Sequence, residues 1–144
     1  MATVADVLGK KGHDIWSISP DSSVFDAIKL MSEKGIGALL VMTDDHLTGI
    51  VSERDYARKV ILQGRSSQET PVSAIMSTTV VTVQPDRTVD QCLALMTEKR
   101  FRHLPVVAGD RVLGILSIGD LVKASLAEKE QLIEQLERYI TGGR

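Results

Sequence analysis

The chain contains an internal duplication. Shifting the sequence by 65 positions aligns residues 20–55 with residues 85–120 without a gap. Identical residues stand at 14 of these 36 positions, and GIVSERD at 49–55 is repeated as GILSIGD at 114–120. A duplication constrains the architecture more than any other feature, because both copies must fold into the same unit.

Each copy has the pattern of a β-α-β-β-α unit. A short strand, at 14–19 and at 79–84, precedes a helix that opens with a capping-box pattern at Ser23 or Thr88. Gly35 ends the first of these helices. Two strands joined by a short turn follow, and a second helix begins at each Ser-x-x-Asp. A unit of about sixty residues buries too small a core alone. We therefore predict an α/β (α+β) fold in which two tandem β-α-β-β-α repeats pack around a pseudo-twofold axis.

The duplication also predicts the domain organisation. The first repeat occupies 1–63 and a polar linker occupies 64–71. The second repeat occupies 72–126, and a C-terminal amphipathic helix with its tail occupies 127–144. We expect the final Thr-Gly-Gly-Arg to be flexible.

The C-terminal helix has an apolar stripe. Leu126, Ile133 and Ile140 are seven residues apart, and Leu136 lies in a second row. Two heptads are too few to assert a coiled coil. Two interpretations stay open: the helix packs back onto its own module, or it docks on a second subunit.

Composition excludes several function classes. The net charge is −2 and aromatic residues make up 3%, which argues against nucleic-acid binding. We find no long apolar run, no Cys/His cluster with metal-site spacing, no P-loop and no nucleophile–base pair, so we expect no membrane span, no metal and no catalysis. The single cysteine, Cys92, cannot form a disulfide within the chain and is interpreted as a small buried hydrophobe. A reducing compartment, the cytoplasm, is expected.

The repeated Ser-x-x-Asp has two interpretations. Ser52 with Asp55, and Ser117 with Asp120, can each form a helix N-cap that satisfies backbone N–H groups and requires no ligand. The alternative is a ligand site, because a carboxylate at a strand-to-helix junction can accept hydrogen bonds from ribose hydroxyls and a helix N-terminus favours phosphate.

The doubled β-α-β-β-α unit ending in Gly-apolar-apolar-Ser-x-x-Asp resembles a pair of CBS domains, the Bateman module, over roughly residues 4–126. The stretch SERDYARKVILQGRSSQETPV and the ending ERYITGG are similar to stand-alone CBS-pair proteins of proteobacteria and their plant mitochondrial relatives. The resemblance implies a regulatory module that binds AMP, ADP, ATP, S-adenosylmethionine or NAD(H) between the repeats. It also implies disc-like dimers of pairs.

The resemblance also implies roles for single residues. Asp120 and Ser117 match the family's ribose and ribose-or-phosphate positions in one cleft, and Asp55 and Ser52 match those of a mirror cleft. The family's adenine wall of the first cleft is matched by Ile15, Ile36, Gly37 and Ala38. The wall of the mirror cleft is matched by Val80 and Phe101. Basic positions that reach phosphates in some members of the family are matched by Arg102 and His103. Independently, Arg54 and Arg58 stand one helical turn apart and could face one phosphate, with solvated surface charge as the alternative.

These observations favour a non-catalytic ligand-sensing regulator. We expect it to bind an adenine nucleotide, AMP-like or NAD-like, as a homodimer, and to signal to an unknown effector protein in trans. The competing hypothesis is a protein-interaction or dimerisation module whose clefts bind no ligand, since the capping interpretation accounts for both Ser-x-x-Asp motifs.

Overall fold

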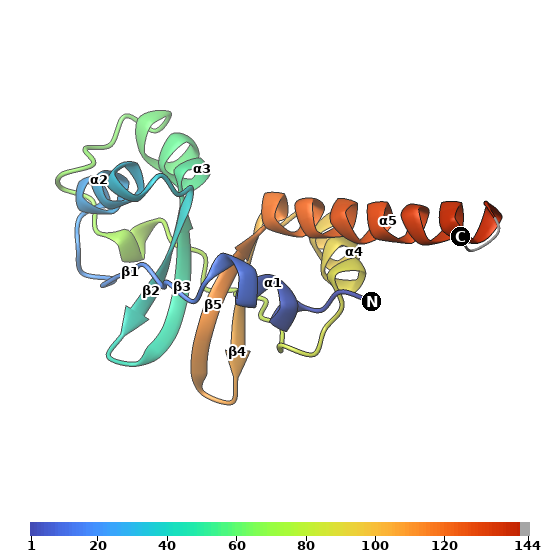
Figure 1. Ribbon diagram of the computed structural model, residues 1–144. Coiled ribbons are helices and arrows are strands. Elements are labelled where there is room, and N and C mark those ends of the chain that lie inside the picture. Colours follow the sequence, from blue (N-terminus) through green and yellow to red (C-terminus); the bar gives the residue numbers. More distant parts are fainter. Residues whose placement is uncertain (142–144) are drawn as a thin grey trace. The chain divides into compact units, whose positions relative to one another are not determined.

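The structure, a computed structural model, describes residues 1–141 (Figure 1). The expected flexible end, apart from Thr141, lies outside the described residues. The chain divides into two compact units. The first-repeat unit is Asp14–Val81; the second-repeat unit combines Met1–His13 with the chain from Thr82 onward.

The first-repeat unit contains the predicted order of elements. Strand β1 (Ser17–Ile18) is followed by helix α2 (Val24–Lys34), strands β2 (Ala38–Thr43) and β3 (His46–Ser52), and helix α3 (Glu53–Tyr56). The sheet order is β1-β2-β3, with β1 parallel to β2 and β2 antiparallel to β3. Helix α3 continues as a π-helical segment, Ala57–Ile61, and a short 3₁₀ helix, Val72–Ala74, comes later. The β-α-β-β-α prediction for this copy is confirmed.

The core of this unit lies between α2 and the sheet. Ser23 is the N-cap of α2 and accepts from the Asp26 N–H, without the reciprocal bond that would complete the predicted capping box. Gly35 ends the helix in a left-handed conformation with φ 64°, as predicted. The helical stripe Val24, Ala27 and Met31 is buried against strand residues. Burying a side chain such as Val24 or Met31 stabilises the unit by about 1.5–3 kcal/mol, before entropy costs.

The second-repeat unit repeats this order with one difference. Helix α4 (Val89–Lys99), strands β4 (His103–Ala108) and β5 (Arg111–Ser117), and helix α5 (Ile118–Ile140) are present. The strand predicted at 79–84 is reduced to a single parallel bridge between Val83 and Val106. The backbone of Val83 bonds to β4 on both sides, donating to Pro105 and accepting from Val107. The pairing stops there, in keeping with Pro85, which has no N–H to donate.

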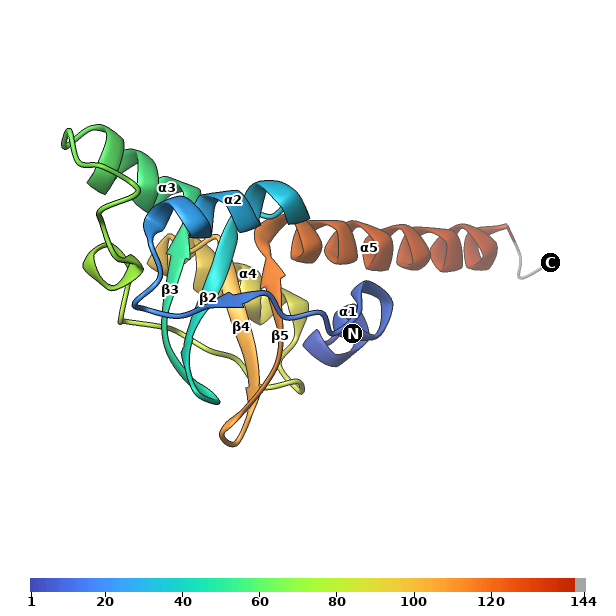
Figure 2. The same cartoon turned by 90° about the vertical axis from the view of Figure 1, so that its left-hand side faces the viewer.

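The N-terminal helix α1 (Val4–Lys11) is not predicted by the sequence analysis. Thr3 caps it in a capping box with Asp6, and Val4 and Leu8 are buried. Although α1 lies within residues 1–63, the range predicted for the first repeat, it packs with the second: Val4 N–H donates to the Arg87 carbonyl at 2.8 Å. Figures 1 and 2 both show α1 beside β5 and under α5.

Two equivalent glycines allow these close approaches. A Cβ on Gly114 would lie 2.8 Å from Leu8 Cδ2 of α1. A Cβ on Gly49, the same position in the other copy, would lie 2.9 Å from the Ser77 carbonyl oxygen. Thus α1 in one unit and the 72–77 segment in the other contact equivalent positions of the third strand.

Candidate functional site

The Ser-x-x-Asp motif of the second-repeat unit forms a complete capping box at the start of α5. Ser117 Oγ accepts a 3.1 Å hydrogen bond from the Asp120 N–H, and Asp120 Oδ2 accepts a 2.8 Å bond from the Ser117 N–H. The capping interpretation is therefore confirmed for this copy. The geometry follows from the spacing alone, since residues N-cap and N3 face one another across the first turn.

The first-repeat unit has the same arrangement at the start of α3. Ser52 Oγ accepts from the Asp55 N–H at 3.2 Å, and Asp55 Oδ2 accepts from the Ser52 N–H at 2.9 Å. The capping interpretation is confirmed here as well. Helix capping alone therefore explains why both copies have a serine and an aspartate at this spacing.

The starts of the middle strands β2 and β4, together with the residue before each, lie beside these caps. Gly37 accepts a 3.0 Å bond through its carbonyl from the Glu53 N–H, and Arg102 accepts a 2.8 Å bond from the Ile118 N–H. In the sheets, Ala38 pairs with Ser52 and His103 pairs with Ser117. Within each unit the structure thus brings the middle-strand positions predicted from the resemblance next to that unit's own Ser-x-x-Asp.

Lys11 is a site residue that the sequence analysis missed. Its Nζ donates a 2.6 Å hydrogen bond to Asp120 Oδ2 and a 2.7 Å bond to the Ile115 carbonyl. Burial by itself raises the pKa of Asp120, but the hydrogen bonds from Lys11 and from the Ser117 N–H outweigh it and hold that pKa below its usual value. Asp120 is therefore ionised at neutral pH.

The repeat could not have revealed Lys11. The equivalent position in the other copy is Met76, so no charge is repeated there. Two available signals were the capping pattern of Thr3 and the Val4/Leu8 spacing, which indicate a helix that ends in lysines.

The two carboxylates differ in how their oxygens are used. Asp55 accepts through Oδ2 in its cap and is 3.2 Å from Lys59 Nζ through Oδ1. In Asp120, the cap and Lys11 both use Oδ2, and within residues 1–141 no hydrogen bond or ion pair reaches Oδ1. Asp120 therefore keeps one oxygen available to accept a hydrogen bond.

The two predicted basic positions are Arg102, just before β4, and His103, the first residue of β4. Burial lowers the pKa of His103, the nearby Lys11 and Arg102 charges lower it further, and Asp120 opposes them. His103 is therefore neutral at pH 7 and can serve as a hydrogen-bonding group. Arg102 is exposed.

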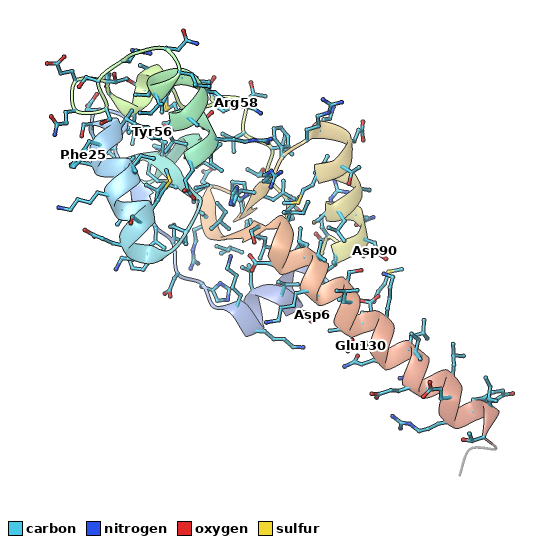
Figure 3. All side chains as sticks on the ribbon, turned by 90° about the horizontal axis from the view of Figure 1, so that it is seen from above. Asp6, Phe25, Tyr56, Arg58, Asp90 and Glu130 are labelled. Carbon is cyan, nitrogen blue, oxygen red and sulfur yellow. The ribbon has the colours of Figure 1, made fainter. Side chains whose placement is uncertain are left out.

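The remaining predicted residues lie in the first-repeat unit, apart from half-buried Phe101. Ile36 packs against the core cluster, which gives it a structural role in addition to the predicted one. Arg54 and Arg58 are exposed, and Figure 3 shows Arg58 on the helical segment after Tyr56. Ile15 and Val80 are half-buried, and Ala38 is buried. The predicted grouping of Ile15, Ile36, Gly37 and Ala38 with Asp120, and of Val80 and Phe101 with Asp55, stays a prediction.

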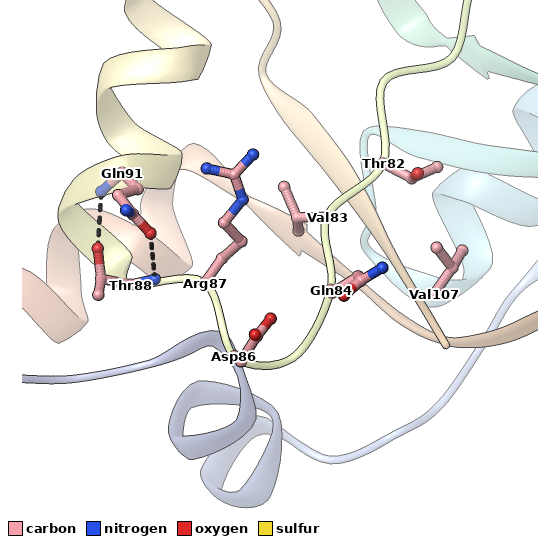
Figure 4. Close-up of a pocket in the computed structure, with 8 residues that line it drawn as sticks. All are labelled: Thr82, Val83, Gln84, Asp86, Arg87, Thr88, Gln91 and Val107. Carbon is pink, nitrogen blue, oxygen red and sulfur yellow. Dashed lines mark hydrogen bonds between the residues drawn. The ribbon is translucent and has the colours of Figure 1, made fainter. Parts of the chain in front are cut away.

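The second-repeat unit has a surface pocket of about 660 Å³ (Figure 4). Two of its polar residues are already occupied, because Thr88 and Gln91 form the capping box of α4. Its lining contains none of the predicted site residues: Thr82, Val83, Gln84, Asp86, Arg87, Thr88, Gln91 and Val107.

Two further searches cover residues 1–141. Among them, no group of three or more His, Cys, Asp or Glu side chains is arranged to hold a metal ion. No helix in the same range combines the length and apolarity needed to span a membrane. Cys92 is buried as predicted, and burial raises the pKa of its thiol.

Comparison with known proteins supports the resemblance. The chain is 53% identical to a candidate signal-transduction protein with CBS domains from Burkholderia ambifaria MC40-6, over 88% of this chain and 95% of that one, with a TM-score of 0.85. It is 40% identical to the mitochondrial CBS domain-containing protein CBSX3 of Arabidopsis thaliana, over 98% of this chain and 73% of the relative.

A more distant structure shares the fold. The CBS domain pair of protein MJ0100, solved with 5′-methylthioadenosine and S-adenosyl-L-methionine, is 24% identical, with a TM-score of 0.79 over 89% of this chain and 98% of that one. Residues 4–61 and 72–127 each match the CBS domain, so this chain belongs to the CBS domain family and carries two copies of the domain.

Proposed function

We propose that this protein is a regulatory sensor of an adenosine-containing ligand, with Asp120 as its main ribose-binding residue and Ser117 beside it. The observation that carries the proposal is the free oxygen of the Asp120 carboxylate. Lys11 and the helix cap both bond Oδ2, and within residues 1–141 no bond reaches Oδ1. A carboxylate accepts about four hydrogen bonds over two oxygens, so Asp120 can cap α5 and still accept from a sugar hydroxyl.

The contrast with the other copy supports Asp120 over Asp55. Both Asp55 oxygens already have partners, since Oδ1 faces Lys59 and Oδ2 completes the cap. A ligand at Asp55 must therefore compete with an ion pair as well as with water. We accordingly assign the ribose-binding role to Asp120 first.

The charge around Asp120 favours a phosphorylated ligand. Lys11 and Arg102 are cationic, whereas His103 is neutral at pH 7 because burial lowers its pKa. AMP, ADP, ATP and NAD(H) carry phosphates that such cations attract, while S-adenosylmethionine is itself a cation. The MJ0100 pair, which shares the fold, is known in complex with adenosine derivatives. We therefore place AMP-like and NAD-like ligands ahead of S-adenosylmethionine.

The regulatory part of the proposal follows from the family. The chain matches CBS domains over both repeats, and such domains are typically regulatory and non-catalytic. We propose that it acts without catalysis, as a homodimer in the cytoplasm, on a partner protein in trans. Ligand binding would change the relative populations of two states of the protein, and the partner would recognise one of them.

Isothermal titration calorimetry with AMP, ATP, NADH and S-adenosylmethionine tests the proposal. Asp120→Asn should weaken binding about tenfold to a hundredfold, because a hydrogen bond to a charged group contributes roughly 1.5–3 kcal/mol. Asp55→Asn is the matched control, with the same change at the equivalent cap, and should keep the wild-type affinity. Absence of heat with all four ligands, or equal weakening by both substitutions, would overturn the proposal.

The second candidate function is a protein-interaction module with unliganded clefts. The observation that favours it is that both aspartates complete capping boxes. On this hypothesis Asp120→Asn lowers the melting temperature by more than the few degrees expected of an isosteric change, and none of the four ligands protects the wild-type protein against thermal unfolding. A ligand-dependent shift in melting temperature excludes it.

A further inference from the structure

Helix α5 extends well past the elements of its own unit that it packs on. It has 23 residues, and every residue from Lys129 to Ile140 is exposed. Figures 1 and 3 show its last turns running beyond α1 and α4. An isolated helix of about 12 residues is only marginally stable in water, so this part gains little from its own chain.

One face of α5 carries a continuous apolar row, which we call the α5 seam. Its members follow one another at spacings of three or four residues, with Lys129 filling the single polar position. All are exposed, from 37% for Ile118 to 79% for Ile140. The structure extends the row toward the start of the helix, because Val122 and Ile118 are exposed and precede Leu126 at spacings of four residues. The seam consists of Ile118, Val122, Leu126, Ile133, Leu136 and Ile140.

The seam is not the face by which α5 packs on its own unit. Leu121 is fully buried, and Ala124, Ser125 and Glu128 are half-buried. At about 100° per residue, Leu121, Ala124 and Glu128 lie roughly 100° or more around the helix from the centre of the seam, and Ser125 lies at its edge, about 60° away. Helix α5 therefore packs onto its own unit through the side that carries Leu121. The seam is left available to another molecule.

We propose that the α5 seam is covered by the α5 seam of a second copy, in a parallel two-helix coiled coil. From Val122 to Ile140 the spacing is that of heptad positions a and d, which suits a partner helix with the same spacing. Ile133 and Ile140 fall at a and Leu136 at d, the combination that favours two strands over three or four in a parallel coiled coil, whereas Leu126 falls at a and Val122 at d.

Charge complementarity supports the same pairing. Lys129 falls at a d position, and in a parallel pair its ammonium group packs beside Glu130 of the partner subunit at the neighbouring e position. Within its own chain Lys129 bonds Ser125 Oγ at 2.8 Å and is 3.9 Å from Asp90, and its side chain is 61% exposed, so it is free to turn toward a partner helix.

This inference takes from the proposed function only that the protein is a homodimer, and its test involves no ligand. Analytical ultracentrifugation of the full chain should give a dimer for the wild type and a monomer for Ile133→Glu. Ile133 is 54% exposed, so the substitution should leave the fold intact, which circular dichroism verifies. Gln135→Glu adds the same charge on the opposite side of the helix and should stay dimeric. A dimer that survives Ile133→Glu, or a monomeric wild type, overturns the inference.

The direction of the helices has its own test. Leu136→Cys places two thiols at the same level of a parallel pair, so mild oxidation should yield a covalent dimer. In an antiparallel pair centred on Ile133 the two thiols would be separated by about six residues, or roughly 9 Å, and would not join. Isothermal titration calorimetry of Ile133→Glu distinguishes a failure of this inference from a failure of the proposed function. A variant that is monomeric but still binds the nucleotide shows that the α5 seam forms the dimer and that ligand binding does not depend on it.

Discussion

Lys11 Nζ lies 2.6 Å from Asp120 Oδ2, which connects the last residue of α1 to the first turn of α5. The same ammonium group donates to the Ile115 carbonyl in β5. One lysine thus holds three elements of the second-repeat unit together at the candidate ribose-binding carboxylate. The N-terminal helix is therefore part of this site as well as part of the unit's packing.

Replacing Lys11 should change the ionisation of Asp120 more than it changes stability. In Lys11→Met, which introduces the residue of the equivalent position 76, we expect the pKa of Asp120 to rise toward its ordinary value, measured by NMR titration of the carboxyl carbon. The free energy of unfolding should fall by less than about 1 kcal/mol, because the two side chains are partly exposed and screened by solvent. Lys10→Met, an exposed neighbour, is the control, and an unchanged Asp120 pKa in Lys11→Met would refute the contact.

His103 should make stability depend on pH near neutrality. Burial lowers the pKa of His103 in the folded state, so the folded protein favours the neutral ring. The associated stability is present above the unfolded pKa of about 6.5 and is lost as pH falls through the lowered folded value. Urea unfolding at pH 7.5 and 5.0 should show that the wild type loses more stability on acidification than His103→Gln does. The same loss in both proteins would contradict the prediction.

The two equivalent glycines should respond differently to alanine. At Gly49 the new Cβ would meet the Ser77 backbone carbonyl at 2.9 Å, whereas at Gly114 it would meet the end of the Leu8 side chain. We expect Gly49→Ala to cost about 2–3 kcal/mol and Gly114→Ala about 1 kcal/mol in urea unfolding. Gly9→Ala, in α1 with nothing within 4 Å, should instead stabilise by about 0.5–1 kcal/mol. The reverse order of the first two would show that Leu8 is less free to move than the backbone at Ser77.

Arg100 should be replaceable with a gain in stability. It ends α4 in the left-handed region with φ 61°, which is strained for a residue with a side chain. The first copy has Gly35 at the equivalent position, also left-handed. Arg100→Gly should therefore raise the free energy of unfolding by about 1 kcal/mol, and Gly35→Arg should lower it by a similar amount. Thermal or urea unfolding of the pair measures both, and a destabilised Arg100→Gly would contradict the strain argument.

Features that the duplication repeats could be predicted from the sequence. The helix starts at Ser23 and Thr88, the end at Gly35 and both Ser-x-x-Asp caps follow from local spacing, and the structure has each of them. Local patterns are sufficient there because a cap is formed by residues three positions apart.

Features present in only one copy could not be predicted in the same way. The pairing of α1 with the second repeat joins Val4 to Arg87, and no local pattern encodes a contact over that separation. Lys11 was missed for the same reason. The strand predicted at 79–84 has the same apolar pattern as the one at 14–19, yet only Val83 pairs, so pairing depends on the position of the neighbouring strand as well as on propensity.

Helix α5 is a single uninterrupted element from the capped Ser117 end to Ile140. A straight rod of 23 residues is roughly 35 Å long, so a tilt of about 5° at its anchored end swings the far tip by about 3 Å. A small change in the orientation of α5 near Asp120 therefore displaces the far end of the helix by a larger distance. This displacement does not depend on a chain of side-chain contacts.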